Sequence, residues 1–147
     1  GICTDLFALR ISYIQAAAAI ELGSLLDPGG FCYRYRDYFF YHIISSASKS
    51  IDFRYLYAQR LNSVIEYDRE HGSDNVRLLE VYLMNEFSVS KTAEIMHLHR
   101  NSVIYRLDKI KTLMGESLED PVFRANLLLS CFTLRLKNAM ENEGEDV

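Results

Sequence analysis

The sequence contains few cysteines and no long apolar run, and each absence excludes a class of protein. The three cysteines, Cys3, Cys32 and Cys131, are odd in number and form no CxxC pair, which argues against a disulfide framework or a thiolate metal site. We expect all three to be small buried apolar residues in a reducing cytoplasm. No apolar run approaches the roughly 18 residues that a spanning helix needs. No secretory start is present either, so we expect a cytoplasmic protein without a membrane partner.

The chain also lacks the net positive charge that often accompanies nucleic-acid binding, since its formal charge is −4. The charge is unevenly distributed, however. Between Ser88 and Thr112 five bases stand against two acids, a local charge of +3, and four acids crowd the last seven residues. A local basic face matters more to a phosphate backbone than the global sum does. The five bases are Lys91, Arg100, Arg106, Lys109 and Lys111.

Apolar residues recur at helical spacing through most of the chain, which predicts a mainly α protein. We expect one strand, Phe31–Arg36, because rings alternate there with other residues, and so a small α/β fragment at the N-terminal end. Three helices are predicted before residue 73: Leu6–Leu22 ended by Gly23, Tyr38–Ala47 capped by Asp37, and Asp52–Glu70 ended by Gly72. A fourth helix is capped by Ser73 or Asp74 and carries Val76, Leu79, Leu83 and Phe87 on one stripe. Two shorter helices follow, and a last one, capped by Asp120, runs from Pro121 to about Asn138.

The two shorter helices have the spacing of a helix-turn-helix. Ser90 is the candidate N-cap of the first helix, and a small residue at Ala93 allows the second helix to cross closely. Leu98 fills the turn. The second helix is expected from about Arg100 to Leu113. A small residue in the first helix, an apolar plug in the turn and an apolar inner stripe in the second helix are typical of this motif. That inner stripe is Val103, Leu107 and Ile110.

The outer face of the second helix carries groups that bind bases and phosphates. The first residues of a recognition helix point most directly at base edges, so we assign base reading to Arg100, Asn101 and Ser102. The remaining candidates are expected to hold the phosphate backbone. On the second helix these are Tyr105, Arg106 and Lys109; on the first they are Ser90, Lys91 and Thr92, which open a helix whose amide end suits a phosphate.

At this point the sequence resembles a known family. Residues 89–136 closely resemble the C-terminal helix-turn-helix of the PucR/CdaR group of bacterial transcription regulators, most specifically over residues 88–121. The pair of helices is also similar to the Fis-type subclass. Three departures stand out: Ser102 replaces a more usual Thr, Phe87-Ser88 replaces Gly-Asn, and His97 stands where Fis-type turns often have Gly. The matching positions are Val89, Ser90, Thr92, Ala93, His99, Arg100, Asn101, Val103, Tyr105, Arg106, Leu107, Ile110, Leu113, Gly115, Leu118, Asp120 and Pro121.

The resemblance extends more weakly to the start of the chain, which looks like the last third of a GGDEF-like domain. It implies three parts: 1–46 from that domain, a connecting helix over 47–72, and a helix-turn-helix domain over 73–147. It further implies a transcription regulator that binds double-stranded DNA as a homodimer. The effector would then be bound by an N-terminal sensor that lies outside this sequence.

Other functions are less well supported by the residues. A nucleotide cyclase would need an acidic pair for magnesium, which Gly29-Gly30-Phe31 lacks, so we expect no enzyme and no cofactor. His97 and His99 have no Cys, Asp or Glu partner for a metal; a turn residue and a helix N-cap are the expected roles. The aromatic cluster from Tyr33 to Tyr41 lacks the basic groove of a single-strand binder. The open alternative is a helical dimerisation or protein-interaction module that no longer binds DNA.

Overall fold

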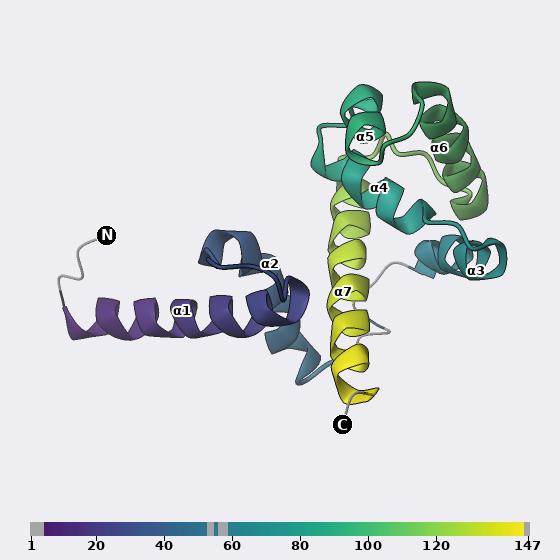
Figure 1. The fold of residues 1–147 in the computed structure, drawn as a ribbon. Helices are drawn as coiled ribbons and strands as arrows, with labels where there is room; N and C mark the ends of the chain where they lie inside the picture. The colour runs from purple at the N-terminus through teal and green to yellow at the C-terminus, as the bar shows by residue number, and fades with distance from the viewer. Residues whose placement is uncertain (1–4, 53–54, 56–58, 146–147) are drawn as a thin grey trace. The chain divides into compact units, whose positions relative to one another are not determined.

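The computed structural model describes residues 5–52, 55 and 59–145. The chain forms two compact units, one of residues 1–53 with 132–147 and the other of residues 54–131. The predominance of helix is confirmed, and the described residues contain no strand. The elements are α1 (Leu6–Leu26), α2 (Tyr35–Ser48), the short 3-10 helix η2 (Gln59–Leu61), α3 (Asn62–His71), α4 (Asn75–Met84), α5 (Val89–Ile95), α6 (Arg100–Met114) and α7 (Pro121–Glu145) (Figure 1).

In the first unit, α1 packs against α2 and is longer than expected. The Asp5 carboxylate caps α1 by accepting the Ala8 N–H at 2.7 Å. Gly23 does not end the helix but lies buried inside it, where a Cβ would collide with the Tyr33 ring. The glycine therefore serves close packing rather than a left-handed helix end.

The expected strand Phe31–Arg36 is wrong, and with it the small α/β fragment. Residues 31–34 are irregular and α2 begins at Tyr35, so Asp37 lies in the first turn of the helix instead of capping it. The rings pair along the helix, as Tyr35 does with Phe39 at 6.0 Å. The described residues offer no partner strand, and an isolated strand is at best marginally stable, whereas ring pairs four residues apart stabilise a helix.

Much of α1 is exposed and apolar, including Leu6 and Phe7. By length and composition alone α1 could cross a membrane, with a window of mean hydropathy 1.3, although core helices of soluble proteins pass the same test. The sequence analysis predicted the helix but not a candidate span, because Arg10 and Glu21 interrupt its apolar run. Cys32 is also exposed, against expectation, whereas Cys131 is buried as expected and Cys3 lies outside the described residues.

In the second unit, α3 to α6 and the first part of α7 surround one core. The helix expected over Asp52–Glu70 is realised only as η2 and α3 among the described residues, since 53–54 and 56–58 lie outside them. The expected end at Gly72 is confirmed. The core consists of Leu61, Val64, Leu78, Leu79, Leu83, Ala93, Val103, Leu107, Ile110, Met114, Leu118, Leu127 and Cys131.

The N-terminus of α4 is capped by a side chain of α3 and not by a residue of the loop between the two helices. Asp74 occupies the N-cap position of α4, but its side chain makes no capping bond. Instead the Asp68 carboxylate accepts the Val76 N–H at 2.9 Å and the Ser73 hydroxyl at 2.6 Å. One carboxylate thus ties the end of α3 to the start of α4.

Four consecutive helix ends, those of α3 to α6, turn through the left-handed region, two of them with glycine, at Gly72 and Gly115, and two without it. Gly72 ends α3, Glu86 and Phe87 follow α4 at φ 56° and 60°, and His97 follows α5 at φ 52°. After α4 the Phe87 N–H donates to Tyr82 O, and after α5 the Leu98 N–H donates to Ala93 O. These are the six-to-one bonds of Schellman motifs, which satisfy carbonyls at a helix end.

The long helix α7 begins as expected. The Asp120 carboxylate accepts the N–H groups of Val122 and Phe123, both at 3.1 Å, and Pro121 opens the helix. Capping and a proline in the first turn together fix this start. The helix continues to Glu145, beyond the expected end near Asn138.

The left-handed backbone at His97 predicts that a variant with glycine at this position is more stable than one with valine. A β-branched side chain is poorly tolerated at positive φ, so we expect His97→Val to lower the free energy of unfolding by about 1–2 kcal/mol. His97→Gly should be neutral or stabilising. Urea unfolding of both variants measures this, with the same pair at helical Glu94 as control, where glycine should be the worse residue. Equal stabilities for Val and Gly at position 97 would contradict the prediction.

The buried thiol of Cys131 predicts a reactivity difference. Burial, with a smaller effect of the Glu80 charge, raises the pKa of Cys131 from 9.0 to about 12. The folded thiol stays protonated where the unfolded one ionises, so its stabilising contribution is full below about pH 9 and is lost between pH 9 and 12. In a Cys3→Ser chain at pH 8, iodoacetamide should label Cys32 quickly and Cys131 only after urea unfolding, as followed by mass spectrometry. Similar rates for both thiols in the folded chain would refute it.

Candidate nucleic-acid interface

The N-cap of α5 lies two residues earlier than expected, and the helix begins at Val89. Ser88, not Ser90, is the N-cap, and its hydroxyl accepts the Lys91 N–H at 3.3 Å. The Thr92 hydroxyl donates to Ser88 O at 2.9 Å, and Thr92 is fully buried. The Thr92 side chain therefore belongs to the structure of the turn and cannot hold a phosphate, which corrects that expectation. Ser90 and Lys91 are exposed in the first turn.

The turn between α5 and α6 follows the expected plan. Ala93 and Val103 are buried, and Leu98 packs against the core. His99 is the N-cap of α6, with its Nδ1 accepting the Asn101 N–H at 3.2 Å. His97 is the left-handed turn residue. Both histidines therefore have the roles expected of them.

Three polar stripes run along α6 outside its buried stripe. Residues three or four apart share a stripe, whereas consecutive residues point about 100° apart. Arg100, Asn101 and Ser102 therefore do not share one face but spread across the exposed half of the first turn. Opposite the core lie Asn101, Tyr105 and Thr112; on one flank lie Ser102, Arg106 and Lys109; on the other lie Arg100, Ile104 and Lys111.

Most of these candidate side chains are available to a ligand. Arg100, Asn101, Ser102 and Tyr105 are exposed, Tyr105 to 73%. Arg106 is half-buried. In the part of the chain that the structure describes, the side chains of these five residues make no hydrogen bond, ion pair or ring contact. Polar groups held on a rigid helix without internal partners can contact bases and phosphates directly.

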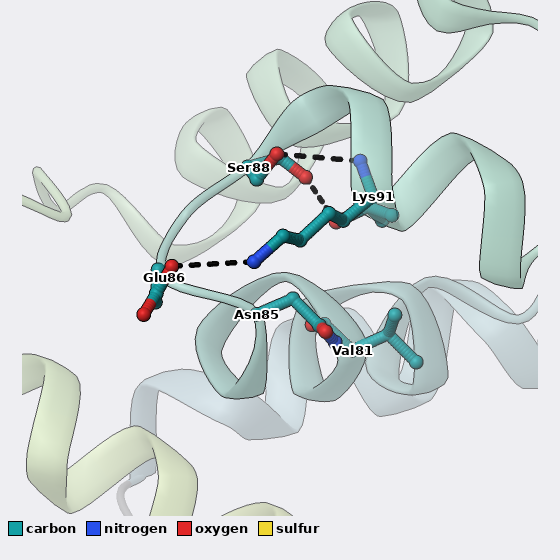
Figure 2. A network of polar contacts seen from close by, with 6 residues as sticks. Val81, Asn85, Glu86, Ser88 and Lys91 are labelled. Carbon is teal, nitrogen blue, oxygen red and sulfur yellow. Dashed lines mark hydrogen bonds and ion pairs between the residues drawn. The ribbon is translucent and has the colours of Figure 1, made fainter.

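Lys91 is held by a carboxylate in the turn before α5 (Figure 2). Its Nζ lies 3.3 Å from Glu86 Oε2, and both side chains are largely exposed. Glu86 reaches Lys91 because its left-handed backbone reverses the chain beside Asn85, whose side-chain amide donates to Val81 O at 2.8 Å. The ion pair partly offsets the charge that Lys91 offers to a phosphate.

Lys109 is held differently, above an aromatic ring. Its Nζ lies 4.7 Å from the centre of the Tyr67 ring on α3. Sequence reasoning missed both Glu86 and Tyr67. Helical periodicity does not connect Glu86 with Lys91, because the chain leaves the helix between them, and Tyr67 is brought to Lys109 only by tertiary packing of α3 on α6.

The geometry of α5, the turn and α6 defines a helix-turn-helix domain of the kind that binds DNA. Residues 76–132 match the family model of the PucR C-terminal helix-turn-helix domain, so the chain carries this domain. Phe87 and His97 of this domain have a left-handed φ, the conformation that glycine adopts most easily.

Two bacterial regulators are similar to most of the chain. The purine catabolism regulatory protein of Bacillus subtilis (strain 168) is 31% identical over 136 residues, which cover 92% of this chain and 25% of that protein. The proline-responsive transcriptional activator PutR of the same strain is 24% identical over 133 residues, covering 90% and 32% respectively. The chain thus spans a quarter to a third of the length of these relatives. No solved structure gives a significant match.

The Glu86–Lys91 pair predicts that removing a carboxylate strengthens DNA binding. Glu86→Gln releases Lys91 and should raise the affinity for duplex DNA about two- to fivefold at low salt, the range of an exposed ion pair. Fluorescence anisotropy measures the change. Glu94→Gln removes the same charge from exposed α5 without releasing a lysine and is the matched control. An equal gain in both variants, or a gain that persists with Lys91→Ala, would show that the pair is not responsible.

Proposed function

We propose that this chain is the output end of a transcription regulator that reads specific double-stranded DNA with α6 in the major groove. The observation that carries this proposal is the matched helix-turn-helix domain combined with an exposed α6 face. On that face the side chains of Arg100, Asn101 and Tyr105 have no partner among the described residues. The similarity to two transcription regulators supports it. The printed function of neither relative identifies the genes or effector of this chain.

Within this proposal the candidate residues divide into two roles. Arg100 and Asn101 carry the side chains that fork to guanine and adenine, and Ser102 lies beside them at the same helix end. Ser90, Lys91, Tyr105, Arg106 and Lys109 hold the phosphate backbone on either side. Thr92 leaves the set because its side chain is buried.

We further propose the larger organisation that the resemblance implies. Residues 1–46 are the tail of a GGDEF-like domain, 47–72 connect it, and 73–147 bind DNA. Both relatives align over about nine-tenths of the chain, well beyond the helix-turn-helix, which supports a shared upstream part. The regulator works in the cytoplasm as a homodimer on two half-sites, without enzymatic activity, and its effector binds elsewhere in the full-length protein.

The base-reading assignment is tested on a duplex selected by the chain from a random library. Arg100→Ala and Asn101→Ala should each cost about 1–3 kcal/mol of binding free energy and relax the preference at one base. Fluorescence anisotropy at two salt concentrations measures affinity, which should fall steeply with salt. Arg10→Ala, an equal change of charge on exposed α1, is the control and should have little effect.

Two results would contradict the proposal. Unchanged binding by both Arg100→Ala and Lys109→Ala would refute α6 as the recognition helix. Absence of any salt-dependent binding to the selected or to mixed duplex would favour the alternative, a dimerisation or protein-interaction module. The exposed apolar face of α1 is the observation that speaks for that alternative.

A further inference from the structure

The three lysines of the interface are anchored by different chemistry. Lys91 lies 3.3 Å from Glu86 and Lys111 lies 3.4 Å from Asp108, so a carboxylate faces each of these ammonium groups. Lys109 instead lies over the face of the Tyr67 ring, 4.7 Å from its centre. A carboxylate holds a lysine by cancelling its charge. An aromatic ring holds it through the quadrupole and leaves the net charge in place.

The ring that holds Lys109 is itself fixed. Tyr67 stacks on His71, one turn later in α3, with ring centres 4.0 Å apart and an angle of 15° between the planes. His71 Nδ1 lies 3.0 Å from Tyr67 O. The η2–α3 segment is anchored beside α6 through Leu61 of η2 and Val64 of α3, both fully buried in the shared core. Tyr67 and His71 thus form a rigid platform beside the Ser102–Arg106–Lys109 stripe of α6.

We propose that Tyr67 is a positioning residue for DNA binding, which holds the Lys109 ammonium beside the recognition helix with its charge uncancelled. A free lysine loses much side-chain freedom when it contacts a phosphate, and ordering it beforehand lowers that cost. Tyr67 itself need not touch DNA. This inference rests on the proposed function, because it assigns a role within the same interface.

The purely structural alternative makes a different prediction. If Tyr67 only stabilises the packing of α3 on α6, its removal should weaken DNA binding whether or not Lys109 is present. If it acts through the ammonium, its effect should vanish once the ammonium is gone. A double-mutant cycle between Tyr67 and Lys109 separates these two cases.

The experiment uses the full chain and a fluorescein-labelled duplex of mixed sequence, because phosphate contacts do not depend on base sequence. Tyr67→Leu should weaken binding about two- to fivefold, the range for an exposed cation–π contact. Tyr67→Phe keeps the ring and should bind like the parent chain. Lys109→Gln should lower the slope of log affinity against log salt by the amount of about one phosphate contact. Adding Tyr67→Leu to the Lys109→Gln chain should weaken DNA binding little further. The matched control is Lys111→Gln, which removes a lysine that is already paired with a carboxylate. In the Lys111→Gln chain, Tyr67→Leu should weaken DNA binding as much as it does in the parent chain.

NMR gives a second readout that does not depend on DNA or on a folded Tyr67→Leu variant. The ring should shift the Lys109 Cε protons upfield relative to those of Lys111 in the parent chain, and Tyr67→Phe should preserve that shift. Loss of affinity in Tyr67→Leu that is equal with and without Lys109, no loss at all, or no ring-induced shift at Lys109 would each overturn the inference. Failure of the parent chain to bind duplex DNA would instead refute the proposed function, and this role with it, even if the shift were present.

Discussion

Burial of one stripe of α6 is the constraint on which the interface depends. Val103, Leu107, Ile110 and Met114 are at most 4% exposed and face a core built by α3, α4, α5 and the start of α7. Each such side chain contributes about 1.5–3 kcal/mol when buried. Rotating α6 about its axis would expose this stripe, so the remaining faces are held outward. The chemistry of the interface therefore follows from which residues occupy those faces.

The turns on either side of α5 impose a second constraint, this time on charge. Left-handed backbone at a non-glycine residue costs about 1–2 kcal/mol, and Schellman hydrogen bonds help to offset it after both α4 and α5. Phe87 adds ring contacts with Tyr82 at 5.7 Å and with the Arg124 guanidinium at 4.3 Å. The strained turn after α4 also carries Glu86 to Lys91. Local backbone geometry thus brings a carboxylate to Lys91.

The features that were predicted correctly depend on residues close together in the sequence. The α6 boundaries, its buried stripe, the His99 cap and the Asp120 cap each rest on spacings of a few residues. The errors arise where tertiary contacts decide. Gly23 lies under the Tyr33 ring, and the expected strand over residues 31–36 is replaced by an irregular segment and the start of α2, with no partner strand among the described residues. Ser88 and Ser90 are both good caps by type, and only the turn through Glu86 and Phe87 selects Ser88.

The charge that remains uncompensated limits what one copy of the chain can do on DNA. Among the described residues of the interface, Arg100, Arg106 and Lys109 have no carboxylate partner, whereas Lys91 and Lys111 do. Three neutralised phosphates correspond to a salt dependence of about −2.7 in log affinity per log salt, because each phosphate contributes about −0.9. That is shallow for a protein that must find one site among many, since non-specific binding scales with the same electrostatic contacts. Two copies on adjacent half-sites would double both the phosphate contacts and the bases read. Under the proposed function, a second copy on an adjacent half-site would therefore add the phosphate contacts and base contacts that the small basic face of one α6 does not supply.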